Sequence, residues 1–303
     1  MRVIFLGTSG GLPTPRRSLP SVALLREGEM ILFDCGEGAQ SQIMRKGLGF
    51  GRLTKIMISH LHGDHLSGLM GLLMTLTLLE RTAPLDLYGP GELRPFFESL
   101  VRDIKLRTRF DLNIHTAEPG IIVREDEYHI EAAPVMHSAP CLALALQEKP
   151  RPGRFNLDGA LALGIPEGPL FGRLQKGETV TLDDGRDISP ADVLGPARRG
   201  RRIVYVTDTV YYPPIIPFCR GADLLIHEGM FTSDMEDEAR VRRHCTAAQA
   251  ASIAKEAGAR RLILTHISAR HTDPRPLRDE ARAVFPDSDV AQDLMEVEIP
   301  YED

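Results

Sequence analysis

Short apolar runs recur along the chain, each bounded by glycine, aspartate or proline. They are rich in Val, Ile, Leu and Phe and only a few residues long, which is typical of buried β-strands that end in loops. The runs are RVIFLG (2–7), MILFDCG (30–36), KIMISH (55–60), DLYGPG (86–91), RRIVYVTD (201–208), DLLIHEG (223–229) and RLILTH (261–266). We expect a strand at each of these places.

Between the runs lie segments with the apolar spacing of helices. We expect helices at 37–46, 66–80, 91–102, 246–257 and 275–285. The fourth opens with TAAQ, a capping box in which Thr246 is the N-cap and Gln249 reaches back to it. Because strands and helices are mixed along the chain, the pattern predicts an α/β or α+β fold built in layers.

Two of the apolar runs resemble each other. KIMISH and RLILTH share a basic residue, an apolar run and a terminal pair made of a hydroxyl residue and a histidine. A strand tip that delivers a histidine therefore occurs once in each half of the chain. RVIFLGTSG and RIVYVTDT echo each other more loosely. The repeat favours a sandwich of two halves with a site between them.

Composition adds one contrast to this picture. The 303 residues, 43% hydrophobic and 26% charged, are ordinary for a globular protein with one large core or two modest domains. Segment 149–202 is dense in Pro and Gly and carries ten Lys/Arg against seven acids, a net +3 within a total of −6, which leaves −9 elsewhere. Such a segment is a candidate for contact with an anionic partner, and a solvated loop is the alternative.

The spacing of the cysteines and the length of the apolar stretches indicate where in the cell the protein is located. Cys35, Cys141, Cys219 and Cys245 are widely spaced and form no CxxC pair, which argues against a disulfide scaffold or a thiolate zinc site. The first apolar run is shorter than a signal-peptide core, and 66–79 is too short and too rich in Gly, Ser and Thr to span a bilayer. We therefore expect a cytoplasmic protein without a membrane anchor.

The stretch SHLHGDHLSG concentrates three of the ten histidines and an aspartate, namely His60, His62, Asp64 and His65. Imidazoles and carboxylates are ligands for zinc and related ions, and Gly63 permits the tight turn between them. Four donors on one loop exceed what a closed zinc site takes from a single strand tip, so the pattern predicts two metals. A polar loop that is merely rich in histidine is the alternative.

Further ligands are expected where other apolar runs end. His137 in PVMHS, Asp208 in YVTDT and His266 in LTHIS occupy such positions. Taken alone, each is more often a hydrogen-bonded strand-end or turn residue; together with the histidine-rich loop they form a ligand series. Asp34 in FDCGEG is interpreted as a turn residue or a support for the ligands. The expected metals are two Zn²⁺ ions per chain, and Mn, Fe or Co also suit such donors.

Of the remaining histidines, one is a candidate proton donor and the others are expected to have no catalytic role. His244 stands just before the capped helix, where a side chain with an unperturbed pKa of about 6.5 could donate a proton. An exposed loop residue is the alternative. We expect His227 to be a buried, hydrogen-bonded neighbour of the site. His115, His129 and His271 are interpreted as surface residues.

Several segments together resemble the ribonuclease Z family, the tRNA 3′-processing endonucleases of the metallo-β-lactamase superfamily, in their short, bacterial-type form. HLHGDH is typical of the superfamily, and the likeness to the family runs through nearly the whole chain. The narrower segments are GTSGGLPTPRRS, EKPRPGRFN, GIPEGPLFGRLQKGETV, IHEGM and RHCTAAQAA. In the family's Pro-x-Lys-x-Arg-Asn loop this chain keeps Pro13 and Arg17, whereas Pro15 and Ser18 replace Lys and Asn. Gly229, Met230 and Cys245 also depart from the family's usual residues.

The resemblance implies a fold and a ligand arrangement. The fold is a single α/β domain over 1–303, the αββα sandwich of two sheets face to face with helices outside, with an inserted flexible arm at 149–202. One zinc would take His60, His62 and His137, and the other Asp64, His65 and His266, with Asp208 bridging them.

The resemblance also implies a function. The protein would be a zinc-dependent endoribonuclease that removes 3′ trailers from precursor tRNA and leaves a 3′-hydroxyl. Pro13 and Arg17 would contact the tRNA 3′ end, and the arm, with Gly168 and Pro169, would grip the tRNA body. A homodimer is implied, with the arm of one subunit serving the site of the other.

Hydrolysis of a phosphodiester assigns roles to particular residues. Two metals about 3.5–4 Å apart can generate a hydroxide and neutralise phosphate charge. Asp64 can also accept a proton from the attacking water, and His244 can donate one to the leaving ribose 3′-oxygen. Glu228 is a candidate for orienting His244, although the sequence shows no contact between them. The competing hypotheses are a hydrolase of a small ester, thioester or phosphodiester, and a metal-stabilised RNA-binding protein.

Overall fold

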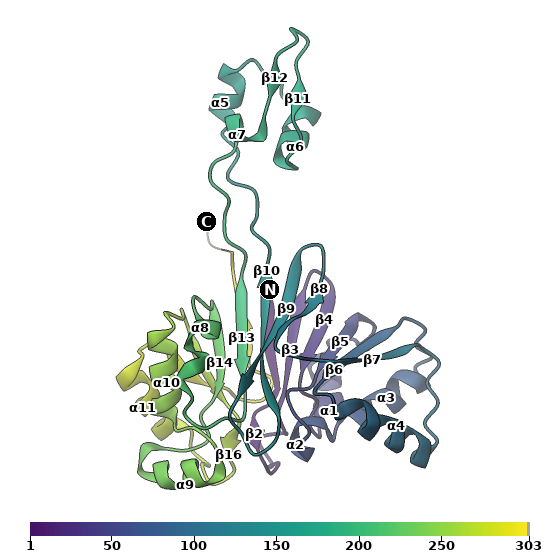
Figure 1. Cartoon of the computed structure of the whole chain (residues 1–303), viewed down its shortest axis with the longest axis vertical. Helices are drawn as coiled ribbons and strands as arrows, with labels where there is room; N and C mark the ends of the chain where they lie inside the picture. The colour runs from purple at the N-terminus through teal and green to yellow at the C-terminus, as the bar shows by residue number, and fades with distance from the viewer. Residues whose placement is uncertain (302–303) are drawn as a thin grey trace. The chain divides into compact units, whose positions relative to one another are not determined.

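All seven predicted strands form, and further strands join them into two sheets (Figure 1). The computed structural model describes residues 1–301. The first sheet has the order β18-β1-β3-β4-β5-β6-β7 and the second has the order β17-β15-β14-β13-β10-β9-β8. The strands of the first sheet are β1 (Arg2–Gly7), β3 (Ser21–Arg26), β4 (Glu29–Phe33), β5 (Leu53–Met57), β6 (Leu85–Gly89), β7 (Leu112–Thr116) and β18 (Glu296–Glu298). Those of the second are β8 (Gly120–Arg124), β9 (Tyr128–Val135), β10 (Cys141–Glu148), β13 (Arg202–Val206), β14 (Leu224–Glu228), β15 (Leu262–Thr265) and β17 (Ser288–Val290).

The chain divides into two compact units. Unit 1 comprises Met1–Gln147 and Arg202–Pro300, and unit 2 comprises Glu148–Arg201 together with Tyr301. In unit 1 the two halves of the chain build separate sheets, as the internal repeat predicts. The exception is β18, which returns to pair antiparallel with β1.

Helices cover the outer face of each sheet in unit 1 (Figure 1). On the first sheet lie α1 (Ala39–Lys46), α3 (Leu69–Leu78) and α4 (Leu93–Ile104), and on the second lie α8 (Ile216–Cys219), α10 (Ala247–Glu256) and α11 (Arg275–Val284). The five predicted helices are therefore confirmed to within three residues. The capping box is confirmed as well, because the Gln249 amide N–H donates to the Thr246 hydroxyl and the Thr246 amide N–H donates to the Gln249 side chain.

The core between the two sheets follows from the two-residue period of the strands. Phe5 and Phe33 of the first sheet pack with Tyr205 and Ile226 of the second, and all four are fully buried. The rings of Phe33 and Tyr205 stack with their centroids 5.7 Å apart. Burial of each such side chain stabilises the fold by about 1.5–3 kcal/mol. The layers are therefore helix, sheet, sheet and helix, the αββα sandwich.

Some elements of unit 1 were not predicted. The strand β9 carries the mixed sequence YHIEAAPV, in which buried and half-buried residues alternate, so no apolar run marks it. The helix α9 (Glu236–Arg242) has the sequence EDEARVR and buries only Ala239, so it lacks an apolar stripe. Within residues 1–301 no helix is both long enough and apolar enough to cross a membrane.

Unit 2 has a small hydrophobic core of its own. Its elements are α5 (Leu157–Ala162), α6 (Pro169–Gln175), α7 (Pro190–Val193) and the hairpin of β11 (Val180–Thr181) and β12 (Asp187–Ile188). Its buried side chains are Ala160, Ile165, Leu174, Val180, Leu182, Ile188 and Val193. Gly168 precedes α6 with φ 142°, a conformation that favours glycine, and Pro169 occupies the first helical turn. These bounds differ by one residue from the expected 149–202.

The base of unit 2 is held by charged and aromatic side chains. The Arg201 guanidinium donates to both carboxylate oxygens of Glu148, at 2.8 and 2.7 Å, and both side chains are buried. The Tyr301 ring lies between the guanidinium groups of Arg151 and Arg201, whose carbons are 3.5 and 3.6 Å from its centroid. These side chains join the two chain segments at the base of the unit.

Candidate metal centre

The ends of five strands converge on one place in unit 1. The strands β13, β14 and β15 are parallel neighbours, so Asp208, Glu228 and His266 lie at the same edge of the second sheet. His60 follows β5 of the first sheet, and the short helix α2 (Gly63–Leu66) begins three residues later. His137 follows β9. The candidate residues therefore come from both sheets, as the repeat of strand-tip histidines predicts.

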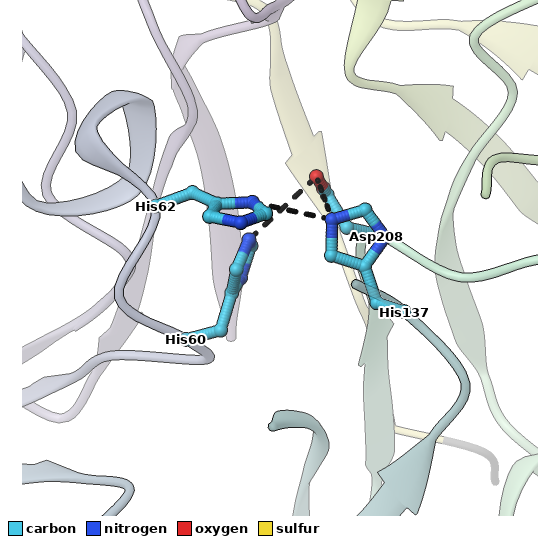
Figure 2. A group of neighbouring side chains, drawn as sticks. All are labelled: His60, His62, His137 and Asp208. Atoms are coloured by element: carbon cyan, nitrogen blue, oxygen red, sulfur yellow. Dashed lines mark hydrogen bonds and ion pairs between the residues drawn. The ribbon is translucent and has the colours of Figure 1, made fainter. Parts of the chain in front are cut away.

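The first group contains His60, His62, His137 and Asp208, whose side chains point toward one another (Figure 2). The Nδ1 atom of His62 is 3.2 Å from Nε2 of His137. The Asp208 Oδ2 atom is 3.7 Å from Nε2 of His60 and 3.6 Å from Nε2 of His137. Ligand atoms of all four residues lie within 4.8 Å of one another.

The second group contains Asp64, His65 and His266. The Nε2 atom of His266 is 3.3 Å from Oδ2 of Asp64 and 3.3 Å from Nε2 of His65. The other carboxylate oxygen of Asp208, Oδ1, is 3.2 Å from Nε2 of both His65 and His266. Each oxygen of Asp208 therefore faces a different group. The structure brings all seven candidate ligands together in two neighbouring groups, and their division between two metals stays a prediction.

The donor atoms fit a divalent metal. His65 donates Nδ1–H to Asp34 at 2.7 Å, and His137 donates Nδ1–H to the Arg243 carbonyl at 3.0 Å, so Nε2 is the nitrogen that each ring, when neutral, can offer to a metal. The buried Nε2 of His60 has no hydrogen-bond partner within residues 1–301. Such an orphaned nitrogen among carboxylates and imidazoles is what a metal ion would satisfy.

For the pair formed by His60 and Asp208, protonation equilibria favour the metal-binding state. Burial and then the neighbouring His65 lower the pKa of His60 to about 2, so its imidazole is neutral at pH 7. Burial opposes ionisation of Asp208, but His266 and His65 hold the pKa of that carboxyl well below its usual range. A neutral imidazole facing an ionised carboxylate is the form that binds a divalent cation. Burial works against a charge on His65, but Asp208 and Asp34 raise the pKa of that imidazole well above its usual value, so a metal would displace a proton from this ring.

The backbone beside His266 is tightly packed and has an unusual conformation. The strand β16 (Ile267–Ser268) pairs with β2 (Ser9–Gly10), and a Cβ atom on Gly10 would stand 2.6 Å from Nδ1 of His266. His266 itself has φ 56°, a left-handed conformation that is costly for a residue with a side chain.

His244 lies beside the centre and contacts Glu228. It is positioned between α9 and α10, and its Nδ1 is 3.0 Å from Oε1 of Glu228. Glu228 is fully buried and also accepts hydrogen bonds from the amides of Thr209 and Cys245. Burial works against a positive charge on His244, yet the Glu228 carboxylate raises the pKa of the imidazole to about 9. Ligand atoms of His244, Asp208 and His266 lie within 4.8 Å of one another.

The contacts of Arg243 had no sequence signal, whereas Ser59 belongs to the hydroxyl–histidine pair of the repeat. Arg243, with φ 61°, donates from its guanidinium to the His137 carbonyl at 2.8 Å and accepts the His137 ring N–H on its own carbonyl. Ser59 donates to Asp34 and contacts His60, whereas the matching Thr265 hydroxyl has no hydrogen-bond partner in the described part of the chain. The hydroxyl–histidine pairs of the repeat are therefore alike in sequence and unlike in their hydrogen bonds.

The loop expected to contact substrate borders a cavity of about 720 Å³. Arg17 lines it, but the Arg17 guanidinium donates to Thr8 and to the Ala291 carbonyl, both at 2.6 Å, which ties the arginine to the body of unit 1. Pro13 is exposed, and the nearby Gly11 amide donates to Oδ2 of Asp64 at 2.9 Å. Gly168 and Pro169 belong to unit 2 and are not part of the cluster.

The histidines expected to have no catalytic role lie apart from the ligand groups. His115 is hydrogen-bonded to Asp86 at 2.8 Å and stacks on Tyr88. His227 is fully buried, as expected, and donates to the Glu228 carbonyl at 2.7 Å. His115, His129 and His271, which were all expected at the surface, are each half-buried, and His271 lines the same cavity as Arg17.

Two face-to-face sheets with outer helices and a His/Asp cluster at the strand ends define a protein of the metallo-β-lactamase fold. A model of the β-lactamase superfamily domain matches residues 177–267, and a model of the anti-Pycsar protein Apyc1 matches residues 1–139. Ribonuclease Z of Methanosarcina acetivorans is 45% identical over 302 residues, which cover 99% of this chain and 99% of that protein. Ribonuclease Z of Myxococcus xanthus is 44% identical, over 100% of this chain and 99% of that protein. The chain belongs to the ribonuclease Z family.

A solved structure agrees with this assignment. The short form of human tRNase Z superposes with a TM-score of 0.73 at 29% identity, covering 99% of this chain and 100% of that one. The agreement over both full lengths extends the likeness from single motifs to the whole architecture.

The ligand arrangement makes a prediction about stoichiometry. We expect elemental analysis of metal-replete protein to find about two metal ions per chain, and the double substitution His65→Ala with His266→Ala to leave about one, because both residues belong to the Asp64 group. The matched control is His115→Ala, which removes a histidine bonded to a carboxylate elsewhere and should leave both ions bound. A single ion in the parent, or two in the double variant, contradicts the ligand set.

Proposed function

We propose that this chain is a metal-dependent endoribonuclease that removes 3′ trailers from precursor tRNA and leaves a 3′-hydroxyl on the tRNA. One observation carries the proposal: relatives that bear the name ribonuclease Z match it over essentially its whole length. The His/Asp cluster supplies donors suited to phosphodiester hydrolysis. The finer assignment is two Zn²⁺ ions, with His60, His62 and His137 holding one, Asp64, His65 and His266 holding the other, and Asp208 between them.

The chemistry divides between the metal and the side chains. When bound at this centre, divalent metal lowers the pKa of a coordinated water and offsets charge on phosphate oxygens. Asp64, held by the Gly11 amide, is positioned to accept the proton that the attacking water loses. His244 is held by Glu228 through Nδ1, so its Nε2 is free to donate a proton to the leaving ribose 3′-oxygen. Glu228 therefore acts by orienting His244.

The arm and the assembly extend this proposal. Segment 149–202 carries net +3 in a chain of net −6, which supports contact with the tRNA phosphates. Gly168 and Pro169 shape the start of α6 in that segment, and Pro13 and Arg17 are proposed to border the tRNA 3′ end. We further propose a homodimer in which the arm of one subunit serves the site of the other. The cytoplasm is the proposed location, where precursor tRNA would meet the enzyme.

A cleavage assay tests the function. A 3′-extended tRNA transcript incubated with metal-replete protein should yield a tRNA that is a substrate for 3′-end ligation, which requires a 3′-hydroxyl, and a trailer with a 5′-phosphate. Chelation of the metal should stop both products from forming, and metal addition should restore them. Hydrolysis of a small ester or phosphodiester by the same preparation, with the tRNA left intact, would contradict the proposal and favour the rival hydrolase.

A further inference from the structure

A single buried carboxylate accepts hydrogen bonds from several groups around the metal centre. Asp34 follows β4 in a left-handed conformation with φ 57° and is fully buried. Its Oδ1 accepts from the Ser59 amide at 2.7 Å. Its Oδ2 accepts from the Ser59 hydroxyl at 2.9 Å, from Nδ1–H of His65 at 2.7 Å and from the Tyr205 hydroxyl at 2.8 Å. Asp34 is not a candidate ligand, but it contacts the ligand His65 at Nδ1, the ring nitrogen that does not face the centre.

The directions of these hydrogen bonds fix the tautomers of two ligands. The Ser59 hydroxyl has one proton, and because that proton goes to Asp34, the Ser59 oxygen must accept from Nδ1 of His60, which lies 3.0 Å away. In their neutral forms His60 and His65 therefore both carry the proton on Nδ1, and Nε2 is the nitrogen that each can offer to a metal. His60 belongs to one candidate ligand group and His65 to the other. One carboxylate thus orients a histidine in each group.

Tyr205 approaches this carboxylate from the opposite sheet. It is on β13, three residues before Asp208, and its ring is fully buried in the core between the sheets, stacked on Phe33. Packing alone does not explain the hydroxyl, because phenylalanine would fill the same space without a buried polar group. The hydroxyl joins the strand that leads to Asp208 to the carboxylate that orients His60 and His65.

We propose that Tyr205 is a positioning residue of the metal centre, which acts through Asp34 on His60 and His65. Its hydroxyl donates a hydrogen bond to Asp34. That bond holds the Asp34 carboxylate where it can accept from both Ser59, which contacts His60, and His65. The loop with His60 and His65 and the strand before Asp208 are thereby held in one alignment. The inference rests on the metal centre and not on the identity of the RNA substrate.

Replacement Tyr205→Phe tests this role because it removes only the hydroxyl. We expect affinity for Zn²⁺, measured by competition with a chelating dye, to fall by about 10-fold for at least one ion, the lower end of the effect of losing an outer hydrogen bond, because Tyr205 contacts the ligands only through Asp34. The visible spectrum of the Co²⁺-substituted protein should shift, since the ligand field depends on imidazole orientation. For tRNA cleavage, kcat should fall with little change in KM.

A matched control separates positioning from general stability. Tyr128 is buried in the same core and its hydroxyl donates to the carboxylate of Glu29 at 2.9 Å, away from the ligand groups. Tyr128→Phe therefore deletes an equivalent hydrogen bond, and it should leave both metal affinities unchanged. Parental metal affinities in Tyr205→Phe overturn the proposal. So does an equal loss of affinity in Tyr128→Phe, because that outcome would reflect loosening of the whole core.

A second variant tests the hydrogen bonds of Asp34 through which Tyr205 is proposed to act. Ser59→Ala breaks the hydrogen bonds that link Asp34 to His60 and spares the direct bond from Asp34 to His65, so loss of affinity should be confined to one of the two ions. Loss of both ions, or of neither, would contradict the network. Because metal binding is measured directly, a parent chain that binds two ions but leaves tRNA intact would remove the proposed function while this inference stands.

Discussion

Replacement of His244 by alanine is expected to slow single-turnover cleavage of 3′-extended tRNA by roughly 10²–10⁴-fold, with both metal ions still bound. The reason is geometric: Glu228 holds Nδ1 of His244 at 3.0 Å, and Glu228 is itself fixed by two backbone amides. The other ring nitrogen is then free to protonate a leaving oxygen. Rates should be measured with enzyme in excess, alongside elemental analysis of the same preparation.

The leaving group provides the control for this prediction. In a substrate whose bridging 3′-oxygen is replaced by sulfur, the thiolate departs without a proton, so His244→Ala should cut it at close to the parental rate. His129→Ala, a change in the hairpin of β8 and β9, should cut both substrates normally. Parental cleavage of the oxygen substrate by His244→Ala, or an equal loss on both substrates, would show that His244 is not the proton donor.

Removal of most of unit 2 is expected to separate tRNA binding from hydrolysis. A Gly/Ser linker in place of 149–200 retains Glu148 and Arg201, whose buried ion pair can still close the base. Binding of tRNA should weaken strongly, and the slope of log K against log salt should flatten by about 0.7–0.9 for each phosphate that the arm no longer neutralises. Hydrolysis of a small chromogenic phosphodiester should persist, because all seven candidate ligands belong to unit 1.

A second set of substitutions tests the same idea without a deletion. Lys149, Arg154 and Lys176 are exposed in unit 2, so their joint replacement by alanine should leave its core intact while reducing the salt dependence of tRNA binding. Unchanged tRNA processing after the deletion contradicts a binding role for the arm. Loss of the small-substrate activity would also contradict it, since unit 1 would then depend on unit 2 for its chemistry.

Much of the centre could be predicted because its signals are local. An apolar run that ends in His or Asp predicts both a strand and the position where that strand ends. The segments that end at His60, Asp208 and His266 are examples. The dense loop from His60 to His65 marks the same place a second time. Neither signal depends on which strands become neighbours.

Hydrogen bonds across the fold had no comparable signal. His244 and Glu228 are 16 residues apart and Tyr205 and Asp34 are 171 residues apart, so only the tertiary structure reveals either hydrogen bond. The elements of unit 2 were missed because they are short and interrupted by Pro and Gly, and their core takes isolated apolar residues from each. Local periodicity is weak where every element is this short.

The return of β18 to the edge of β1 has a consequence for the order in which the protein is made. Arg2 pairs with Glu298 and Val3 with Val297. The first strand to leave the ribosome therefore cannot complete its pairing until nearly the whole chain has been synthesised. At about 5–20 residues per second, β1 would have one unpaired edge for roughly 15–60 s during synthesis. An unpaired edge is a surface on which nascent chains associate wrongly. Chaperone protection of the amino-terminal half during translation should therefore matter more for the yield of this enzyme than protection after release.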